Sequence, residues 1–193
     1  MIVFLIGNYV TKNPAYVWME VNGIGYEVNI SLHTYSKIQS LEKGRLLTYL
    51  HIKEDGHSLY GFFDEEERNL FLLLISVSGV GTSTARMMLS SMKPDEISNA
   101  IRTDNEVALG RIKGIGPKSA KRLILELKDK LLKTKGEVNL DAAPHNNLEN
   151  DALNALVSLG IARNAAFVAI QKSIKQEAGL SLEDLIKLTL KNI

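Results

Sequence analysis

The 193-residue sequence contains no cysteine, few aromatic residues (6%) and almost no net charge (+1). Without cysteine there is no disulfide framework and no thiolate metal site, which suits a reducing cytoplasm. The scarcity of aromatic rings argues against a general single-strand-binding OB module, because such modules stack bases on those rings. A nucleic-acid-binding surface would therefore depend on local clustering of basic residues.

The sequence also lacks the patterns of a catalytic, metal or cofactor site. The string Gly116-Pro117-Lys118-Ser119 is not a nucleotide-binding P-loop, because proline stands where that motif needs glycine. His51 and His57 flank a predicted hairpin and would face each other across it, but no H-E-x-x-H motif is present, so we expect ordinary strand residues. The apolar residues 1–6 are too short for a membrane span and lack a basic leader, so we expect a buried strand there.

The chain divides into four regions, which together predict an α+β multidomain protein. Residues 1–63 alternate apolar and polar positions between turn signals, which predicts a small OB-like β-barrel with a hairpin turning at residues 54–56. Residues 64–132 have helical periodicity and open with an acidic run, 64–67, expected to cap a helix. Residues 133–150 lack a pattern and predict a flexible linker. Residues 151–193 predict a small three-helix, UBA-like module.

Two Gly-hydrophobe-Gly turns, residues 79–81 and 114–116, recur 35 residues apart. The same shift aligns further pairs around them, namely Leu74 with Leu109, Val77 with Ile112, Thr84 with Ser119, Ala85 with Ala120, Arg86 with Lys121 and Met88 with Leu123. Apolar residues at helical spacing precede and follow each turn, so each copy predicts a helix, a tight hairpin and a second helix.

Such hairpins are expected to hold DNA phosphates through the free N–H groups of the following helix, without reading the bases. The second copy is the stronger candidate for binding DNA phosphates, because positions 111–135 around it contain nine lysines and arginines and only two acidic residues. The first copy has Thr82-Ser83 where the second has Pro117-Lys118, so its grip would depend on N–H groups and hydroxyls. The candidate DNA-backbone residues are Gly79, Val80, Gly81, Ser83, Thr84, Gly114, Ile115, Gly116, Lys118, Ser119, Lys121 and Arg122.

The predicted module at residues 151–193 has nearly balanced charge, so DNA is not its expected partner. An apolar patch that binds another protein is one interpretation of its leucines, and a tiny core filled by the same residues is the other. The candidate partner-binding residues are Leu156, Leu159, Ile161 and Leu190.

In this order, the barrel, the tandem hairpins, the linker and the helical tail resemble the RuvA family, whose members bind Holliday junctions in the branch-migration complex. The resemblance covers essentially the whole chain and is sharpest at Glu54-Asp55 with the following 59–62, at 77–81 and at 114–123. It implies a non-catalytic, sequence-independent junction-binding subunit that acts in recombination and DNA repair in the cytoplasm. Ile161 departs from the aromatic residue usual in the family's tail, and Thr82-Ser83 from its commoner Pro-Lys.

The resemblance also implies partners. The subunit would form a homotetramer, with Glu54 and Asp55 clustered as an acidic pin at the crossover, and it leaves open whether tetramers pair into octamers. The tail would recruit a RuvB-type ATPase, and a RuvC-type resolvase is a further implied partner.

A DNA-repair glycosylase or lyase is the rival interpretation, since these enzymes also carry helix-hairpin-helix units. It would need a pocket for a flipped base and a catalytic Asp or Lys beyond the hairpin. Asp129 is the nearby candidate, but it lies on a lysine-rich stretch where solvated ion pairing is the simpler explanation.

Overall fold

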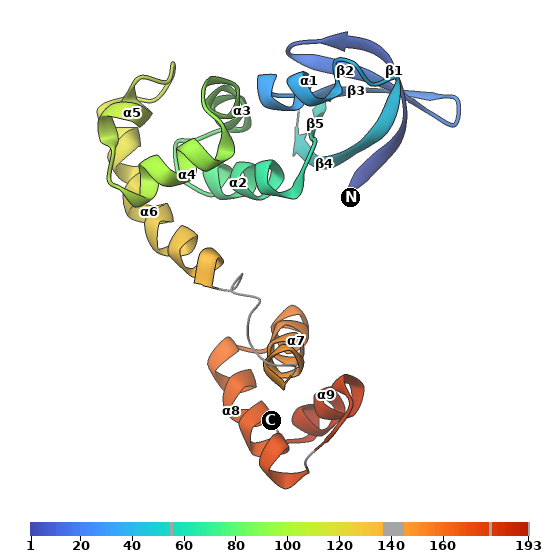
Figure 1. Cartoon of the computed structure of the whole chain (residues 1–193), viewed down its shortest axis with the longest axis vertical. Coiled ribbons are helices and arrows are strands. Elements are labelled where there is room, and N and C mark those ends of the chain that lie inside the picture. Colours follow the sequence, from blue (N-terminus) through green and yellow to red (C-terminus); the bar gives the residue numbers. More distant parts are fainter. Residues whose placement is uncertain (55, 137–144, 178, 193) are drawn as a thin grey trace. The chain divides into compact units, whose positions relative to one another are not determined.

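The computed structural model describes residues 1–54, 56–136, 145–177 and 179–192 (Figure 1). The chain forms two compact units, 1–136 and 137–193. The first unit opens with the predicted barrel, which is closed in the strand order β1-β2-β3-β5-β4. Its strands are β1 (Phe4–Asn13), β2 (Tyr16–Val21), β3 (Ile24–Asn29), β4 (Lys43–Lys53) and β5 (Gly56–Phe62). Neighbouring strands are antiparallel except β3 and β5, which are parallel.

The barrel interior follows the predicted alternation, with Val17, Met19 and Val28 fully buried. The expectation of a buried strand at residues 1–6 is correct only in part. β1 begins at Phe4 and buries Leu5, but Phe4 and Ile6 are 51% and 59% exposed. A strand in a closed barrel has one inner face, so a continuous apolar run necessarily leaves alternate residues outside.

A short helix that the sequence analysis did not predict, α1 (Leu32–Ile38), connects β3 to β4 and lies between the barrel strands and α3 (Thr82–Ser91) (Figure 1). Ser31 caps it, because its hydroxyl accepts from the Thr34 N–H at 3.1 Å.

The helices of the first unit pack against one another, and α2 (Glu65–Ile75) packs directly on strands β4 and β5 of the barrel. The further helices of this unit are α4 (Pro94–Arg102), α5 (Glu106–Gly110) and α6 (Pro117–Gly136). The ring of Phe71 on α2 lies 5.6, 5.4 and 4.8 Å from the rings of Tyr49, Tyr60 and Phe62. These barrel residues share one continuous core with the helices, so the barrel and the hairpins form a single packed body.

The acidic run at the start of α2, residues 64–67, has two roles. Asp64 caps the helix as expected, since its carboxylate accepts from the Glu67 N–H at 2.9 Å. Glu67, in contrast, is fully buried and accepts from the hydroxyls of Ser31 and Thr34 and from the Phe63 N–H. Burial raises the pKa of the Glu67 carboxyl above its ordinary value. This residue therefore ties α2 to the segment around α1 and β5.

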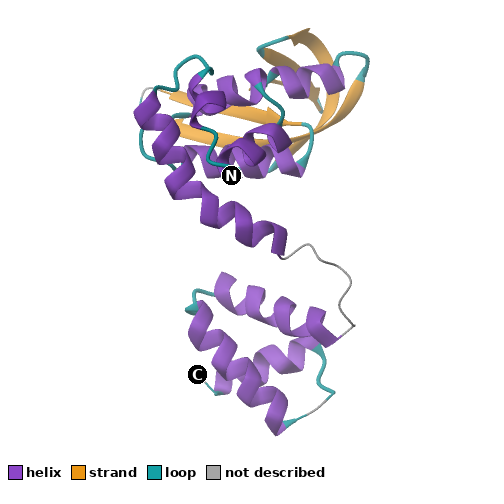
Figure 2. Cartoon of the chain, turned by 60° about the vertical axis from the view of Figure 1, so that its left-hand side comes forward, coloured by secondary structure: helices purple, strands orange, loops and turns teal. Residues whose placement is uncertain are grey.

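The second unit consists of α7 (His145–Ser158), α8 (Arg163–Gln176) and α9 (Leu182–Lys191) around a small apolar core. Figure 2 shows all the described strands in the unit that carries the N-terminus, whereas the described residues of the second unit form helices and loops. The predicted linker boundaries need correction, because α6 continues to Gly136 and α7 begins at His145; residues 137–144 lie outside the described residues. Of the helices described, none is long and apolar enough to cross a membrane.

Candidate nucleic-acid interface

The two glycine turns have matching backbone hydrogen bonds. We call Val77–Gly81, between α2 and α3, hairpin one, and Ile112–Gly116, between α5 and α6, hairpin two. In hairpin one the Val80 N–H donates to the Val77 carbonyl at 3.0 Å, and in hairpin two the Ile115 N–H donates to the Ile112 carbonyl at 3.0 Å. The repeat seen in the sequence is therefore a repeat of the fold.

The first glycine of each turn needs its special backbone freedom. Gly79 and Gly114 have φ of 90° and 93°, in the left-handed region that side chains disfavour. Both glycines are exposed, and a Cβ at either position would meet nothing within 4 Å. Open space lies above both turns, so a ligand has access to the backbone.

Each hairpin ends at the start of a helix whose first N–H groups have no intrahelical acceptor. The first helical bonds are made by the Ala85 N–H to the Gly81 carbonyl and by the Ala120 N–H to the Gly116 carbonyl, both at 2.9 Å. No side chain caps α3. The N–H groups that precede these bonds, together with the positive end of each helix dipole, suit an anion. Pro117 leaves hairpin two one donor short.

Burial divides the predicted DNA-backbone residues into three groups. Val80 and Ile115 are 5% exposed, and their N–H groups already bond within the turn, so as direct contacts these two predictions are wrong; they anchor the hairpins in the core. Thr84 and Ser119 are half-buried. The positions open to solvent are Gly79, Gly81, Ser83, Gly114, Gly116, Lys118, Lys121 and Arg122.

The basic patch also divides. Arg122 donates to the Ser78 carbonyl at 3.3 Å and pairs with Glu126 at 3.0 Å, so it links hairpin two to hairpin one; its contact with DNA stays a prediction. Lys128 pairs with Asp104. Four basic side chains around hairpin two are exposed and have no hydrogen-bond or ion-pair partner among the described residues, namely Arg111, Lys113, Lys118 and Lys121. These four give hairpin two its positive surface.

At the tip of the β4–β5 hairpin the last strand pair is Lys53 with Gly56. Glu54 is exposed at this tip, and Asp55 lies outside the described residues. The expectation that His51 and His57 face each other is wrong: His51 pairs with Ser58, and His57 pairs with Ile52. No group of side chains suited to a metal ion occurs among the residues that the structure describes.

The leucines predicted to bind a partner differ in burial. Leu156 is fully buried in the core of the second unit, so as a surface contact it is corrected. Leu159 and Leu190 are 65% and 46% exposed, and Ile161 is half-buried. These exposed side chains lie at the carboxyl ends of α7 and α9.

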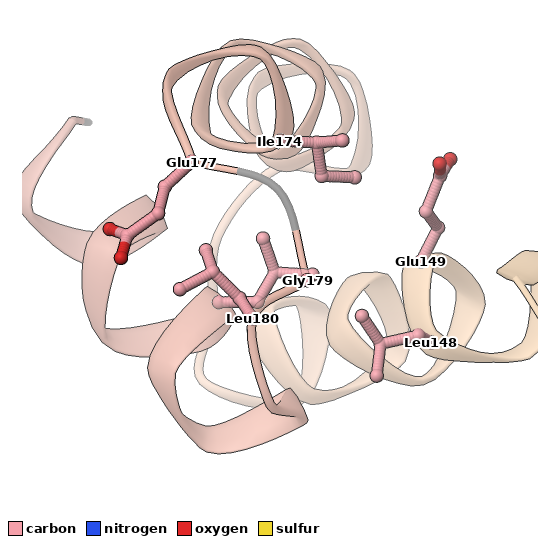
Figure 3. A pocket seen from close by; sticks show the side chains of 7 residues that line it. Leu148, Glu149, Ile174, Glu177, Gly179 and Leu180 are labelled. Carbon is pink, nitrogen blue, oxygen red and sulfur yellow. The ribbon is translucent and has the colours of Figure 1, made fainter.

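The opposite ends of α7 and α9 border an apolar pocket of about 350 Å³ (Figure 3). Leu148, Ile174 and Leu180 line it, and the carboxylates of Glu149 and Glu177 lie on opposite sides of it. Glu149 accepts from the Gln171 amide at 2.9 Å. Neither glutamate was singled out from the sequence.

The side chains of Thr82, Arg86 and Ser90 on α3 bond to the barrel or to α1, and the sequence did not indicate these contacts. The Thr82 hydroxyl, expected to help hold DNA, is buried and accepts from Tyr60. In the sequence Arg86 stands out only as the counterpart of Lys121. The one signal in the sequence was the spacing of the three α3 residues at intervals of four, which places them on one face of a helix. Asp129, the candidate of the rival glycosylase interpretation, is exposed on α6.

Comparisons with known proteins agree with this geometry. Residues 1–61 match the RuvA N terminal domain, and residues 71–129 match the SAM-like Helix-hairpin-helix tandem, which contains both hairpins. The chain is 48% identical over 193 residues to the Holliday junction branch migration complex subunit RuvA of Christiangramia forsetii, with 100% of both chains covered. It is 42% identical over 197 residues to the protein of the same name from Cytophaga hutchinsonii, with 99% of both covered, and 43% identical over 193 residues to that of Flavobacterium psychrophilum, with 100% covered. Because this similarity runs through the barrel, both hairpins and the helical tail, the chain belongs to the RuvA family.

Proposed function

We propose that this protein binds four-way (Holliday) junction DNA through phosphates, without sequence preference, and holds the junction for strand exchange by a separate motor. The observation that carries the proposal is the pair of equivalent hairpins, each leading into a helix with unbonded N–H groups. Contacts to phosphate fix position and do not read sequence. Branch migration replaces one set of base pairs by another, so it requires such a sequence-independent grip.

The test is a set of binding measurements with four-way junctions of unrelated sequence and with a linear duplex. We expect equal affinity for all junctions, weaker binding of the duplex, and a steep fall of log K with log salt. A strong dependence on junction sequence, or no preference for the junction, would contradict the proposal. A strand-incision assay on damaged duplex addresses the rival glycosylase interpretation, and we expect no cleavage.

Glu54, together with Asp55, is proposed as the acidic pin at the crossover. Like charge near phosphates weakens binding but keeps strands apart. Replacing both residues with amides should raise affinity for duplex DNA and reduce the preference for the junction. Unchanged or weaker duplex binding would place the acids away from DNA.

We propose a homotetramer as the working assembly. The outer face of β1 presents Phe4, Ile6 and Val10, which are 51%, 59% and 64% exposed, and Trp18 on the neighbouring strand is 46% exposed. An apolar outer face of this kind favours contact between subunits. Native mass spectrometry with and without a junction distinguishes monomer, tetramer and octamer, and a strictly monomeric species would contradict the proposal.

The second unit is proposed to be a UBA-like module that recruits a RuvB-type ATPase through Leu159, Ile161 and Leu190. Leu159→Asp should abolish ATP-driven branch migration and leave junction affinity unchanged, because it places a charge in an apolar contact. Leu156→Asp is the matched control for misfolding, since Leu156 fills the core. Full motor stimulation by a folded Leu159→Asp variant would contradict this role.

The motor supplies the energy, so we propose no enzymatic activity for this subunit. A RuvC-type resolvase is a further proposed partner at the same junction. Because DNA is the proposed substrate, the cytoplasm stays the expected compartment.

A further inference from the structure

Helix α3 is joined to the barrel along one polar face. Thr82, Arg86 and Ser90 follow one another at intervals of four residues, so their side chains share one side of the helix. The Tyr60 hydroxyl donates to the Thr82 hydroxyl at 3.0 Å, and the Leu32 N–H donates to the Ser90 hydroxyl at 3.1 Å. The two ends of α3 are therefore both bonded to the barrel side of the unit.

Arg86 makes the central and strongest of these connections. Its guanidinium donates to the Ala15 carbonyl and to the Asn29 side-chain oxygen, both at 2.9 Å. Hydrogen bonds from a charged donor are stronger than neutral ones. Asn29 in turn donates to the Leu59 carbonyl at 3.2 Å, so the connection continues to β5.

Strand β5 connects this polar face to the acidic hairpin tip. It begins at Gly56, directly after the turn that carries Glu54, and Tyr60 lies four residues further along, about 13 Å at the usual rise of a strand. The N-terminus of α3, where hairpin one would meet phosphate, is thus held at a fixed distance from the acidic tip.

The equivalent face of α6 has no such connection. A shift of 35 residues places Pro117, Lys121 and Leu125 at the positions of Thr82, Arg86 and Ser90. All three are exposed, Leu125 to 82%, and none of them has a polar side-chain partner among the described residues. The repeat therefore contains one cation that bonds protein and one that faces solvent at the same position.

We propose that Arg86 is a positioning residue, which holds the phosphate-binding end of α3 at a set distance from the acidic β4–β5 tip and so favours four-way over duplex DNA without touching DNA. This inference rests on the proposed function. A junction presents its phosphates and its crossover in one geometry, whereas a duplex has no crossover for the acidic tip to meet. Loosening the connection should therefore affect the choice between the two DNA forms and leave the number of phosphate contacts unchanged.

The test compares Arg86→Ala with Lys121→Ala, its matched control in the second repeat. For each variant we would measure Kd for a four-way junction and for a duplex over a range of salt concentrations. Arg86→Ala should reduce the ratio of junction to duplex affinity roughly threefold to tenfold, which corresponds to the net free energy of about one hydrogen bond. The slope of log K against log salt should stay unchanged. Lys121→Ala should flatten the slope by about 0.9 and keep the preference.

Three further variants test how the effect of Arg86 reaches the DNA preference. Tyr60→Phe removes only the hydroxyl that bonds Thr82 and should lower the preference less than Arg86→Ala, again with unchanged slope. In a background with Glu54→Gln and Asp55→Asn, Arg86→Ala should have little further effect on the preference, because the tip whose position it sets has lost its acidic side chains. Arg86→Lys retains one donor group and should restore part of the preference.

Circular dichroism and native mass spectrometry must show the same fold and assembly for each variant; should Arg86→Ala fail to fold, Tyr60→Phe carries the test. A slope flattened by about 0.9 in Arg86→Ala would make Arg86 a phosphate contact and overturn the proposal. An unchanged preference in a folded Arg86→Ala protein would overturn it as well. If the wild-type protein itself shows no preference, the proposed function fails, and the inference fails with it.

Discussion

Hairpin one and hairpin two hold their first glycines at φ of 90° and 93° and yet present different side chains to solvent. Around hairpin two lie four basic residues, namely Arg111, Lys113, Lys118 and Lys121. The equivalent positions around hairpin one, 35 residues earlier, are Ser76, Ser78, Ser83 and Arg86. In hairpin one the only cation of the set bonds the barrel, whereas in hairpin two all four cations are exposed.

One backbone motif therefore serves two purposes in this protein. Hairpin one is fixed to the barrel through Thr82 and Arg86, and its contribution to DNA binding would come from its N–H groups. Hairpin two has no N–H at Pro117, the first residue of its helix. It would bind phosphate mainly through the charge of its basic side chains. Hairpin one would therefore fix the position of the DNA backbone, and hairpin two would supply most of the electrostatic attraction to it. Substitutions that exchange side chains between the two hairpins test this difference.

The largest effect is expected from replacing Arg111, Lys113, Lys118 and Lys121 by serine. If all four contact phosphate, the slope of log K against log salt should flatten by about 3.6, and affinity near 0.1 M salt should fall roughly tenfold for each contact. Titrations of a fluorescent junction measure both quantities. Lys37→Ser with Lys43→Ser removes exposed charge from the barrel region and should leave the slope unchanged; an equal loss in this control would mean that only net charge matters.

The reverse exchange should strengthen hairpin one. Ser83→Lys places a cation at the position of Lys118 and should steepen the salt slope by about 0.9 and tighten binding roughly tenfold. Ser91→Lys adds the same charge about 12 Å further along α3, beyond the screening length of about 10 Å at 0.1 M salt, and should have a smaller effect. Equal effects of the two variants would show that hairpin one does not meet DNA.

The stability of the protein should depend on pH through Glu67, which ties α2 to the segment around α1 and β5. Burial raises the pKa of Glu67, so the folded protein keeps this proton to higher pH than the unfolded chain. The free energy of unfolding should therefore fall as pH rises from about 4.5 through the folded pKa, by about 1.4 kcal/mol for each unit between the two values. Urea denaturation between pH 4 and 8 measures this fall.

Glu67→Gln is the matched variant, since the hydroxyls of Ser31 and Thr34 can rotate to accept from an amide. Its stability should lack this decrease between acid and neutral pH. A decrease identical to that of the wild-type protein would assign the pH dependence to other groups.

The smallest effects are expected from the turns themselves. Gly79→Ala and Gly114→Ala should each destabilise the protein by about 1 kcal/mol, because both φ angles are positive while a Cβ has open space. Gly81→Ala, at φ −84°, is the control and should be close to neutral. Urea denaturation gives the three values, and a clearly larger loss at Gly79 would mean that strain in hairpin one passes into the barrel.

The sequence was sufficient for the barrel and the tandem hairpins because both depend on local periodicity and on glycine turns. It was insufficient where sequence neighbours have different surroundings. Leu156 and Leu159 lie three residues apart in one apolar pattern, yet the first is buried and the second is exposed. Helix α1 has only seven residues, too few for a clear period.

Arg86 and Lys121 show the same limit at the candidate site. They occupy equivalent positions in the repeat, and the sequence assigns both to one kind of surface. What separates them is a carbonyl 71 residues away, at Ala15, that reaches only Arg86. Contacts across such separations arise from the packing of the barrel on the helices, which no periodicity records.

The closed barrel has a consequence for how the chain folds. β1 pairs with β4, which brings Phe4 opposite Leu47 although the two residues lie far apart in the sequence. β3 pairs in parallel with β5. Pairing of distant strands slows folding, because closing the long loop between them costs conformational entropy before their contacts form. The second unit needs only neighbouring helices to meet. We therefore expect two kinetic phases on refolding, a fast one for the helical unit and a slow one for barrel closure, and hairpin one becomes fixed only in the slow phase.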